Sequence, residues 1–163
     1  MPVIYLLLGA NLGDRAATLN RAAELLASQV GTVLTKSSFW ETAPWGLTDQ
    51  PAFLNQAIAC ATELQPLDLL LATQSIERQL GRVRREKWGA RPIDIDILFY
   101  GIEIVDSPDL QIPHPFLPER RFALAPLAEI APDFVHPVLG KTVVELLAEC
   151  GDASEVSLIL SEP

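Results

Sequence analysis

Cysteine is almost missing from this sequence, and its scarcity excludes one way of stabilising the chain. Only Cys60 and Cys150 occur among 163 residues, and their separation matches no metal-binding or redox motif. Two cysteines in a chain of this length do not form a disulfide framework. We therefore expect reduced thiols and one domain, residues 1–163, that is stabilised by its hydrophobic core.

Long hydrophobic runs are missing too. The longest apolar stretch, Val3–Leu8, is far shorter than the roughly 20 residues that a membrane-spanning helix needs. No basic segment precedes it, as a signal peptide would require. Internal repeats and low-complexity tracts are also absent. We expect a cytoplasmic, monomeric protein.

Positive charge is scarce, with 12 Lys and Arg against 21 Asp and Glu and a net charge of −9. This balance argues against a nucleic-acid groove, which requires a basic face. Six of the twelve basic residues nevertheless lie between positions 78 and 91: Arg78, Arg82, Arg84, Arg85, Lys87 and Arg91. A solvated helix end would explain them, but five are arginines, which suit forked contacts with phosphate. The cluster favours a site for a polyanion.

The hydrophobic pattern predicts the element order β-α-β-β-α-β. The expected strands are Val3–Gly9, Thr32–Glu41, Phe53–Glu63 and Ile93–Tyr100, with helices from Asp14 to Gly31 and from Pro66 to about Gly81. This order is typical of an α+β fold of the ferredoxin-like split βαβ (βαββαβ) type, in which two helices cover one face of an antiparallel sheet and leave the other face open. Extra C-terminal elements are expected as helices near Glu119–Ile130 and Val143–Glu149 and an added strand at Val156–Leu160.

The pair Asp94 and Asp96 carries the clearest chemical signal. The two residues alternate with isoleucines in a predicted strand, so both carboxylates should lie on one face. Mutual repulsion favours a divalent cation between them, and Mg²⁺ is typically held by one or two carboxylates plus substrate phosphates. Solvent-facing aspartates are the alternative, but aspartate is depleted in strands. Arginines immediately before this strand could share a polyphosphate with the metal, as phosphoryl transfer requires.

Other polar and aromatic residues give weaker signals. Gln74 and Glu77 lie three residues apart on the second helix, and the spacing alone favours an exposed polar stripe. His114 lies between two prolines, where it is a plausible phosphate contact. Aromatic residues in or beside loops could clamp a flat heterocycle by stacking, although such residues usually belong to the core: Trp45, Phe53, Trp88 and Phe122.

The segment Lys87–Leu98 resembles the signature of the 6-hydroxymethyl-7,8-dihydropterin pyrophosphokinase family. Six further motifs resemble the same family in the same order: Leu8–Gly13, Ser38–Thr42, Asp49–Pro51, Phe53–Asn55, Gly81–Arg84 and Pro113–Pro115. The resemblance runs from about Val3 to Pro137. Agreement at so many separated places makes the assignment specific.

The resemblance implies transfer of diphosphate from ATP to the hydroxymethyl group of a reduced pterin, giving AMP, in folate biosynthesis. It also implies two Mg²⁺ ions held by Asp94 and Asp96, with Arg82 and Arg91 as catalytic residues beside them. The implied ATP site comprises Gln74, Glu77, Arg82, Arg84, Trp88, Arg91, Ile97, His114 and Arg120. The implied pterin site comprises Thr42, Pro44, Trp45, Phe53, Asn55 and Phe122. In physical terms, the two phenylalanines can sandwich the ring while Asn55 pairs with its amide edge.

Three positions depart from the family pattern: Ala43 replaces a common proline, Trp45 a smaller aliphatic residue, and Phe53 stands where tyrosine also occurs. These changes bear on loop stiffness and pterin affinity. Two other functions use some of the same features. A metal-dependent nucleotidyltransferase would use the aspartates but release diphosphate, and a non-enzymatic sensing domain would need only the pocket aromatics. No general base is evident, and Asp96 is the nearest carboxylate.

Overall fold

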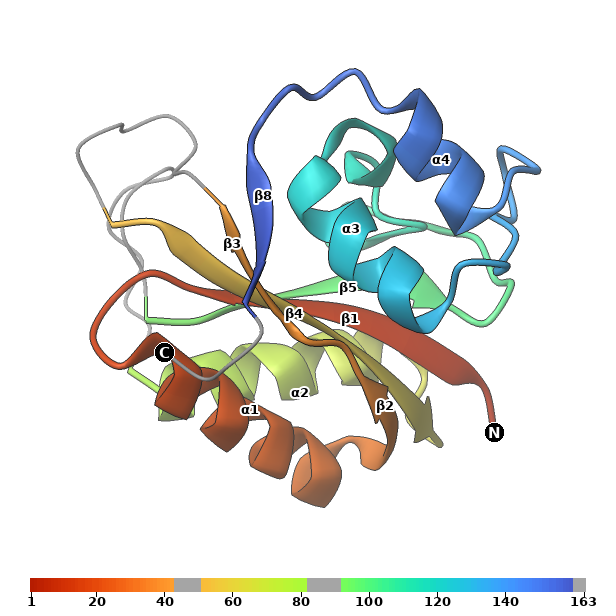
Figure 1. The fold of residues 1–163 in the computed structure, drawn as a ribbon. Helices are drawn as coiled ribbons and strands as arrows, with labels where there is room; N and C mark the ends of the chain where they lie inside the picture. Colours follow the sequence, from red (N-terminus) through yellow and green to blue (C-terminus); the bar gives the residue numbers. More distant parts are fainter. Residues whose placement is uncertain (43–50, 82–91, 160–163) are drawn as a thin grey trace.

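The computed structural model describes residues 1–42, 51–81 and 92–159 (Figure 1). The elements are β1 (Val3–Ala10), α1 (Arg15–Gln29), β2 (Gly31–Lys36), β3 (Phe39–Thr42), β4 (Phe53–Thr62), α2 (Pro66–Gln79), β5 (Asp94–Tyr100), β6 (Val105–Asp106), β7 (Gln111–Ile112), the 3-10 helix η1 (Leu117–Glu119), α3 (Arg121–Ile130), α4 (Val143–Glu149) and β8 (Val156–Ile159). Within the described part of the chain, no helix has the length and apolar character that crossing a membrane requires.

One antiparallel sheet organises the chain. Its strands lie in the order β5-β1-β4-β3-β8, and β2 pairs with β4 next to β3. The predicted α+β fold with an antiparallel sheet is thus confirmed. The expected single strand Thr32–Glu41 is divided at Ser37, whose hydroxyl accepts a hydrogen bond from the backbone N–H of Ala57. The Ser37 N–H still donates to the Ala57 carbonyl, but a side chain replaces the backbone acceptor of the reciprocal bond, so β2 and β3 are separate strands along β4.

Local sequence signals set the helix ends. The Asp14 side chain caps α1 by accepting from the backbone N–H of Ala17, and Pro66 opens α2, both as expected. Gly31, expected to end α1, instead begins β2 after the cap residue Val30. A Cβ at position 31 would lie 2.0 Å from the carbonyl oxygen of Ala61, so glycine is needed there for close approach of β4.

Both faces of the sheet are covered, at least in part (Figure 1). Helices α1 and α2 pack on one face, over a core that includes Leu6, Leu8 and Ile97. Helices α3 and α4 pack on the other face, over Leu7 and Phe99. The expectation that this second face is open is therefore wrong where α3 and α4 lie over it, because these apolar side chains require cover and the C-terminal helices supply it.

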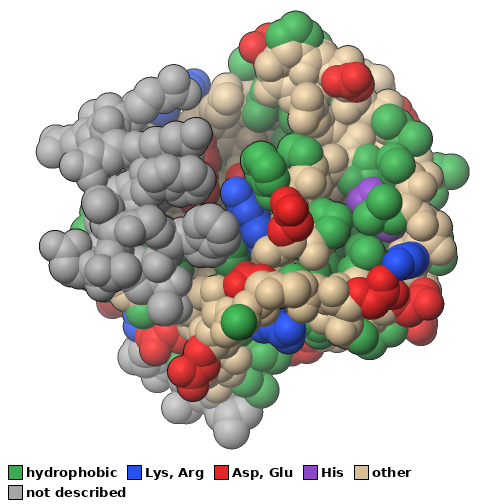
Figure 2. All heavy atoms as spheres, turned by 90° about the horizontal axis from the view of Figure 1, so that it is seen from above, with side chains coloured by type: hydrophobic (Ala, Val, Ile, Leu, Met, Phe, Trp, Pro, Cys, Tyr) green, Lys and Arg blue, Asp and Glu red, His purple; other side chains and the backbone are tan. Residues whose placement is uncertain are grey.

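The molecular surface on the side of α3 and α4 shows no extended patch of one charge over the described residues (Figure 2). Basic and acidic side chains lie next to one another near its centre, among hydrophobic ones. Toward Asp94, the same sheet face carries polar side chains in place of the apolar ones beneath α3 and α4. The chemistry of the molecule is therefore expected at this polar end.

Candidate active site

Asp94 and Asp96 lie on one face of β5, as the alternation predicted. Both are partly exposed, whereas Ile95 and Ile97 are buried against the core beneath α1 and α2. Among the described residues, no group of three or more His, Cys, Asp or Glu gathers closely enough to hold a metal without other ligands. Two accessible carboxylates suit Mg²⁺, which keeps water and phosphate oxygens among its ligands. The donor set therefore fits the expected ion.

Glu77 supports this strand from the opposite side. Its Oε2 atom accepts a hydrogen bond from the backbone N–H of Ile95, 2.8 Å away, and its side chain is buried. Because β5 is an edge strand of the sheet, α2 supplies the acceptor that a further strand would otherwise supply. The stripe interpretation is correct for Gln74, which is exposed, and wrong for Glu77.

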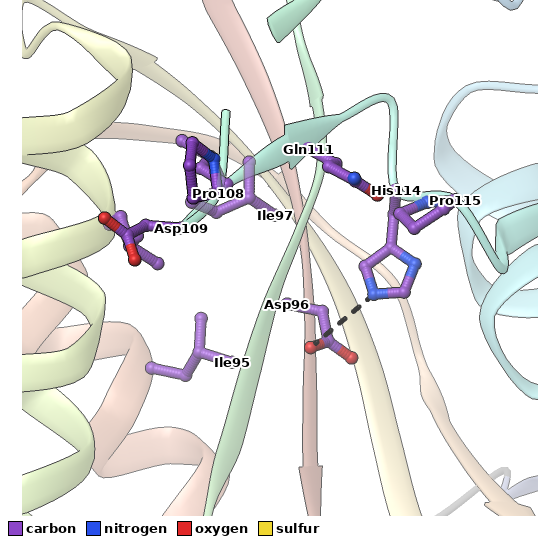
Figure 3. A pocket seen from close by; sticks show the side chains of 10 residues that line it. Ile95, Asp96, Ile97, Pro108, Asp109, Gln111, His114 and Pro115 are labelled. Atoms are coloured by element: carbon purple, nitrogen blue, oxygen red, sulfur yellow. Dashed lines mark ion pairs between the residues drawn. The ribbon is translucent and has the colours of Figure 1, made fainter. Parts of the chain in front are cut away.

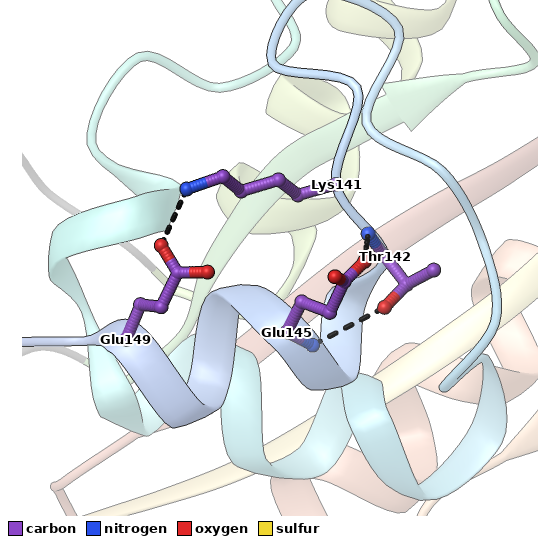
Figure 4. Close-up of polar contacts among 4 residues, drawn as sticks. All are labelled: Lys141, Thr142, Glu145 and Glu149. Atoms are coloured by element: carbon purple, nitrogen blue, oxygen red, sulfur yellow. Dashed lines mark hydrogen bonds and ion pairs between the residues drawn. The ribbon is translucent and has the colours of Figure 1, made fainter.

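His114 lies beside Asp96 (Figure 3). Its Nε2 atom is 4.0 Å from Asp96 Oδ1, and its Nδ1 atom accepts from the backbone N–H of Phe116. Burial lowers the pKa of His114 to about 4, reinforced by the positive charge of Arg120 and partly offset by Asp94. The imidazole is therefore neutral at physiological pH, and with Nδ1 as acceptor its proton resides on Nε2, facing Asp96.

A hollow of about 420 Å³ opens between β5, α2 and the β6–β7 hairpin (Figure 3). Its size is in the range of small-molecule sites. Its lining combines aliphatic side chains with the carboxylate of Asp96 and the ring of His114: Leu70, Ile95, Asp96, Ile97, Pro108, Asp109, Leu110, Gln111, His114 and Pro115. Three of these residues, Asp96, Ile97 and His114, were named from the sequence, whereas the hairpin residues were missed. They carry no chemical motif, and only the packing of β7 beside β5 brings them to the site.

Across the sheet from Asp94 lies a second polar group. Asp94 pairs with Gly9 on β1, and Gly9 pairs with Asn55 on β4, so the three residues form one row. A Cβ on Gly9 would lie 2.7 Å from Asn55 Oδ1, so the absence of a side chain makes room for the amide. Asn55 Nδ2 and the Thr42 hydroxyl are buried and have no hydrogen-bond partner among the residues that the structure describes. Such groups are rare in proteins, and here they indicate that a polar ligand completes them.

Three more of the predicted residues lie at the ends of β3 and β4 or at the start of α3. Phe53 pairs with Thr42 at the ends of β4 and β3. Phe122 lies in the first turn of α3, the helix that packs on β4. The Arg120 guanidinium lies 5.5 Å from the centre of the Phe122 ring, a cation–π arrangement. The remaining predicted residues lie outside the described part of the chain: Pro44, Trp45, Arg82, Arg84, Trp88 and Arg91.

Arg15 is a residue that sequence reasoning missed. Its guanidinium forms an ion pair with Glu41, 2.8 Å away, and donates a hydrogen bond to the carbonyl oxygen of Ala52 at 2.9 Å. Asn11 donates to the neighbouring carbonyl of Pro51. Glu41 precedes and Ala52 follows residues 43–50, so Arg15 ties together the chain on both sides of the predicted pterin segment. The nearby Leu8–Gly13 motif was the one sequence feature that pointed to this region of the chain.

These features define a class of protein. A carboxylate pair suited to Mg²⁺ has a hollow for a small molecule on one side and an unsatisfied buried amide on the other. This is the arrangement of an enzyme that transfers a phosphoryl-type group between two bound small molecules.

Comparison with known proteins identifies the family. The family described as 7,8-dihydro-6-hydroxymethylpterin-pyrophosphokinase (HPPK) matches residues 5–132. The 2-amino-4-hydroxy-6-hydroxymethyldihydropteridine pyrophosphokinase of Porphyromonas gingivalis is 47% identical over 141 residues, which cover 84% of this chain and 95% of that protein. Its counterpart in Methylorubrum extorquens is 52% identical over 146 residues, covering 89% and 91%.

Solved structures agree on the fold. The HPPK-DHPS protein of Plasmodium falciparum matches with a TM-score of 0.74 at 18% identity, over 91% of this chain but only 43% of that one. The chain thus spans less than half of that larger protein. Taken with the sequence matches, the chain belongs to the 7,8-dihydro-6-hydroxymethylpterin pyrophosphokinase family. The family and the enzyme class predicted from the sequence are confirmed, and neither a nucleotidyltransferase nor a sensing domain fits this assignment.

Proposed function

We propose that this chain transfers the β,γ-diphosphate of ATP to the hydroxymethyl group of 6-hydroxymethyl-7,8-dihydropterin, giving AMP and the pterin diphosphate for folate biosynthesis. The observation that supports the proposal is the row Asp94–Gly9–Asn55. It places the Asp94 carboxylate, the proposed magnesium ligand, and the Asn55 amide on one face of the sheet, with no side chain at Gly9 between them. The family relationship supplies the reaction.

ATP is assigned to the hollow beside β5. Its base fits between the aliphatic side chains of Leu70 and Ile97, and its phosphates extend toward Asp96. Neutral His114 donates a hydrogen bond from Nε2 without adding charge. The proposed ATP-binding residues are those that the resemblance implied: Gln74, Glu77, Arg82, Arg84, Trp88, Arg91, Ile97, His114 and Arg120. Among these, Glu77 acts chiefly by fixing the position of β5.

The pterin is assigned to the Asn55 side of the row. Its amide edge would satisfy the unpaired Asn55 Nδ2 and the Thr42 hydroxyl. Its flat ring would stack against aromatic side chains, as heterocycles do in apolar clefts. The proposed pterin-binding residues are Thr42, Pro44, Trp45, Phe53, Asn55 and Phe122.

Asp94 and Asp96 would hold the magnesium, for which we propose two ions. When bound, Mg²⁺ supplies charge neutralisation at the phosphate oxygens and lowers the pKa of a coordinated hydroxyl. Arg82 and Arg91 would stabilise the negative charge that develops during transfer. Asp96 is the carboxylate assigned to receive the hydroxyl proton, and the neutral His114 ring lies 4.0 Å from it.

We propose three finer assignments on the same basis. The strand order β5-β1-β4 followed by β2 and β3 supports the split βαβ arrangement, with the second of its four strands divided in two. The chain forms one domain, as its two continuous cores beneath the helical layers support, and acts as a monomer. Unpaired Cys60 and Cys150 support a reducing, cytoplasmic location.

Product analysis tests the function. The protein is incubated with ATP, Mg²⁺ and 6-hydroxymethyl-7,8-dihydropterin, and nucleotides are separated by chromatography. We expect AMP in equal amount to the pterin diphosphate. Formation of free diphosphate with a nucleotidylated pterin would instead identify a nucleotidyltransferase, and absence of pterin-dependent turnover would refute the proposal.

A further inference from the structure

The C-terminal segment 152–159 joins two elements that carry proposed pterin-binding residues. It lies beyond residues 5–132, the range that the family model matches. From the end of α4 the chain passes over the sheet face and runs down beside β3 as strand β8 (Figure 1). It therefore contacts α3 at its start and the sheet at its end. We call residues 152–159 the C-terminal strap.

At its start, the strap caps helix α3. The residue before this helix, Arg120, makes no side-chain capping hydrogen bond. Instead Asp152 Oδ2 accepts from the backbone N–H of Arg121 at 3.1 Å, and the Asp152 carbonyl accepts from Arg121 Nε at 3.0 Å. A carboxylate at a helix N-terminus satisfies an otherwise unpaired donor and complements the helix dipole. Phe122 is the next residue, so the cap sits one residue from a proposed pterin contact.

Asp152 is itself fixed in this position. Its Oδ1 atom accepts from the backbone N–H of Ser154 at 2.9 Å and from the Ser154 hydroxyl at 2.6 Å. Burial raises the pKa of Asp152, but hydrogen bonds from Ser154 and Arg121 outweigh this effect and leave the pKa below its ordinary value. The carboxylate is therefore charged at neutral pH, and both of its oxygens are used.

At its end, the strap extends the sheet next to the pterin residues. Strand β8 pairs antiparallel with β3, with Val156 opposite Thr42 and Leu158 opposite Trp40. Thr42 is the last residue of β3, and its buried hydroxyl is one of the unpartnered groups. Without β8, β3 would pair with β4 alone among the strands and would form the edge of the sheet.

We propose that the C-terminal strap is a positioning element for the pterin site: Asp152 sets the helix start from which Phe122 projects, and β8 sets the strand end at Thr42. The inference rests on the proposed function, because it needs both residues to contact the pterin. It assigns to Asp152 an effect on pterin affinity without contact to the substrate. The nucleotide hollow, lined from α2, β5 and the β6–β7 hairpin, receives no contribution from the strap.

Calorimetric titration of two ligands distinguishes positioning from general stability. One ligand is 6-hydroxymethyl-7,8-dihydropterin, and the other is the Mg²⁺ complex of α,β-methylene-ATP, in which the bond that breaks in the reaction is replaced. We expect Asp152→Ala to weaken pterin binding about fivefold, the scale of a lost helix cap. Nucleotide binding should change less than twofold, and Asp152→Asn should recover only part of the pterin affinity, because its single amide oxygen can accept from Arg121 or from Ser154 but not from both.

Glu145→Ala is the matched control. It removes the capping box of α4, where Glu145 accepts from the backbone N–H of Thr142, and leaves the strap intact. It should lower thermal stability without changing pterin affinity. A chain ending at residue 155 keeps Asp152 but lacks β8 and should also bind pterin more weakly. If that shortened chain does not bind nucleotide, it is misfolded, and the inference is then judged on the Asp152 variants alone.

Three results would overturn the inference: unchanged pterin affinity in Asp152→Ala, equal weakening of both ligands, or equal effects of Asp152→Ala and Glu145→Ala on pterin binding. Phe122→Ala separates this failure from failure of the pterin site. If Phe122→Ala binds pterin normally while the wild type forms AMP, the role of Phe122 is wrong and the strap inference fails with it, but the reaction stands. If the wild type forms no AMP, the proposed function itself fails.

Discussion

The carboxylate of Glu77 is hydrogen-bonded to the backbone N–H of Ile95, the residue between the two aspartates of β5. The acceptor and the metal-facing side chains lie on opposite sides of the sheet: Glu77 lies on α2 beneath it, whereas Asp94 and Asp96 project from the other face. A buried glutamate on α2 thus fixes the position of the strand that carries the proposed metal ligands.

We expect Glu77→Ala to lower kcat about tenfold and the free energy of unfolding by about 1–3 kcal/mol, because the N–H of Ile95 loses its acceptor. Glu77→Gln keeps an acceptor oxygen and should recover most of the stability. Steady-state kinetics and urea unfolding measure the two effects. Gln79→Ala, at an exposed position of the same helix, is the control. Wild-type kinetics in Glu77→Ala would show that the contact does not position the strand.

Asp94→Ala and Asp96→Ala should each reduce turnover by three orders of magnitude or more, on the order of the loss expected when charge stabilisation of a phosphoryl transfer is removed. Stability should be unchanged or higher, because each substitution relieves repulsion between two like charges. Turnover and thermal unfolding are measured in parallel. Asp106→Ala removes an exposed carboxylate on β6 and should be silent in both. Substantial activity in either strand variant contradicts the metal assignment.

Gly9→Ala tests the row across the sheet. The added methyl group would lie 2.7 Å from Asn55 Oδ1, so the amide must rotate away from its present position. We expect pterin affinity to fall about tenfold, roughly the value of one hydrogen bond to a buried group, while nucleotide affinity is retained. Gly151→Ala adds the same methyl group where nothing lies within 4 Å and serves as the control. Equal pterin affinity in both variants would remove Asn55 from the site.

Arg15→Ala should raise the KM for pterin about fivefold with a smaller change in the KM for ATP. The guanidinium contacts Glu41 and the Ala52 carbonyl on either side of residues 43–50, which include the proposed pterin contacts Pro44 and Trp45, so its loss removes a restraint on both flanks of these residues. Arg21→Ala removes an exposed ion pair with Glu24 on the same helix and should have no effect. If the two variants have the same KM values, the contact is structural only.

Acid should destabilise the protein through its two histidines. Burial lowers the pKa of His136, whose Nδ1 accepts from the backbone N–H groups of Val138 and Leu139. A lowered folded-state pKa means that the unfolded chain binds more protons, so stability falls as the pH drops below about 6.5. His136→Asn keeps an acceptor but cannot titrate. Its melting temperature should fall less than that of the wild type between about pH 7.5 and about pH 5. Parallel curves would contradict this.

Features that depend on residue periodicity or on neighbouring residues could be predicted from the sequence. The period of two placed Asp94 and Asp96 on one face, and the caps at Asp14 and Pro66 opened helices where expected. The burial of Glu77 could not be predicted, because an exposed and a buried acid at the same helical spacing differ only in what the next layer supplies. Gly31 was misread as a helix end for the same reason. Glycine is required there by the close approach of Ala61 on β4, a residue that is distant in the sequence. Contacts such as that of Asp152 with Arg121 have no local signature at all.

The row Asp94–Gly9–Asn55 has a consequence for how such an enzyme can change. Its ends are separated by two inter-strand steps, roughly 10 Å, a spacing that backbone hydrogen bonds set and that side chains cannot adjust. Point mutations can therefore alter how tightly each substrate is held, but not how far apart the two are seated. A different spacing would require a strand to slip by two residues and every core contact along it to be rebuilt. Substitutions that adapt the enzyme to new acceptor substrates should consequently be concentrated in the connecting segments, because the sheet keeps the distance between the two substrates constant.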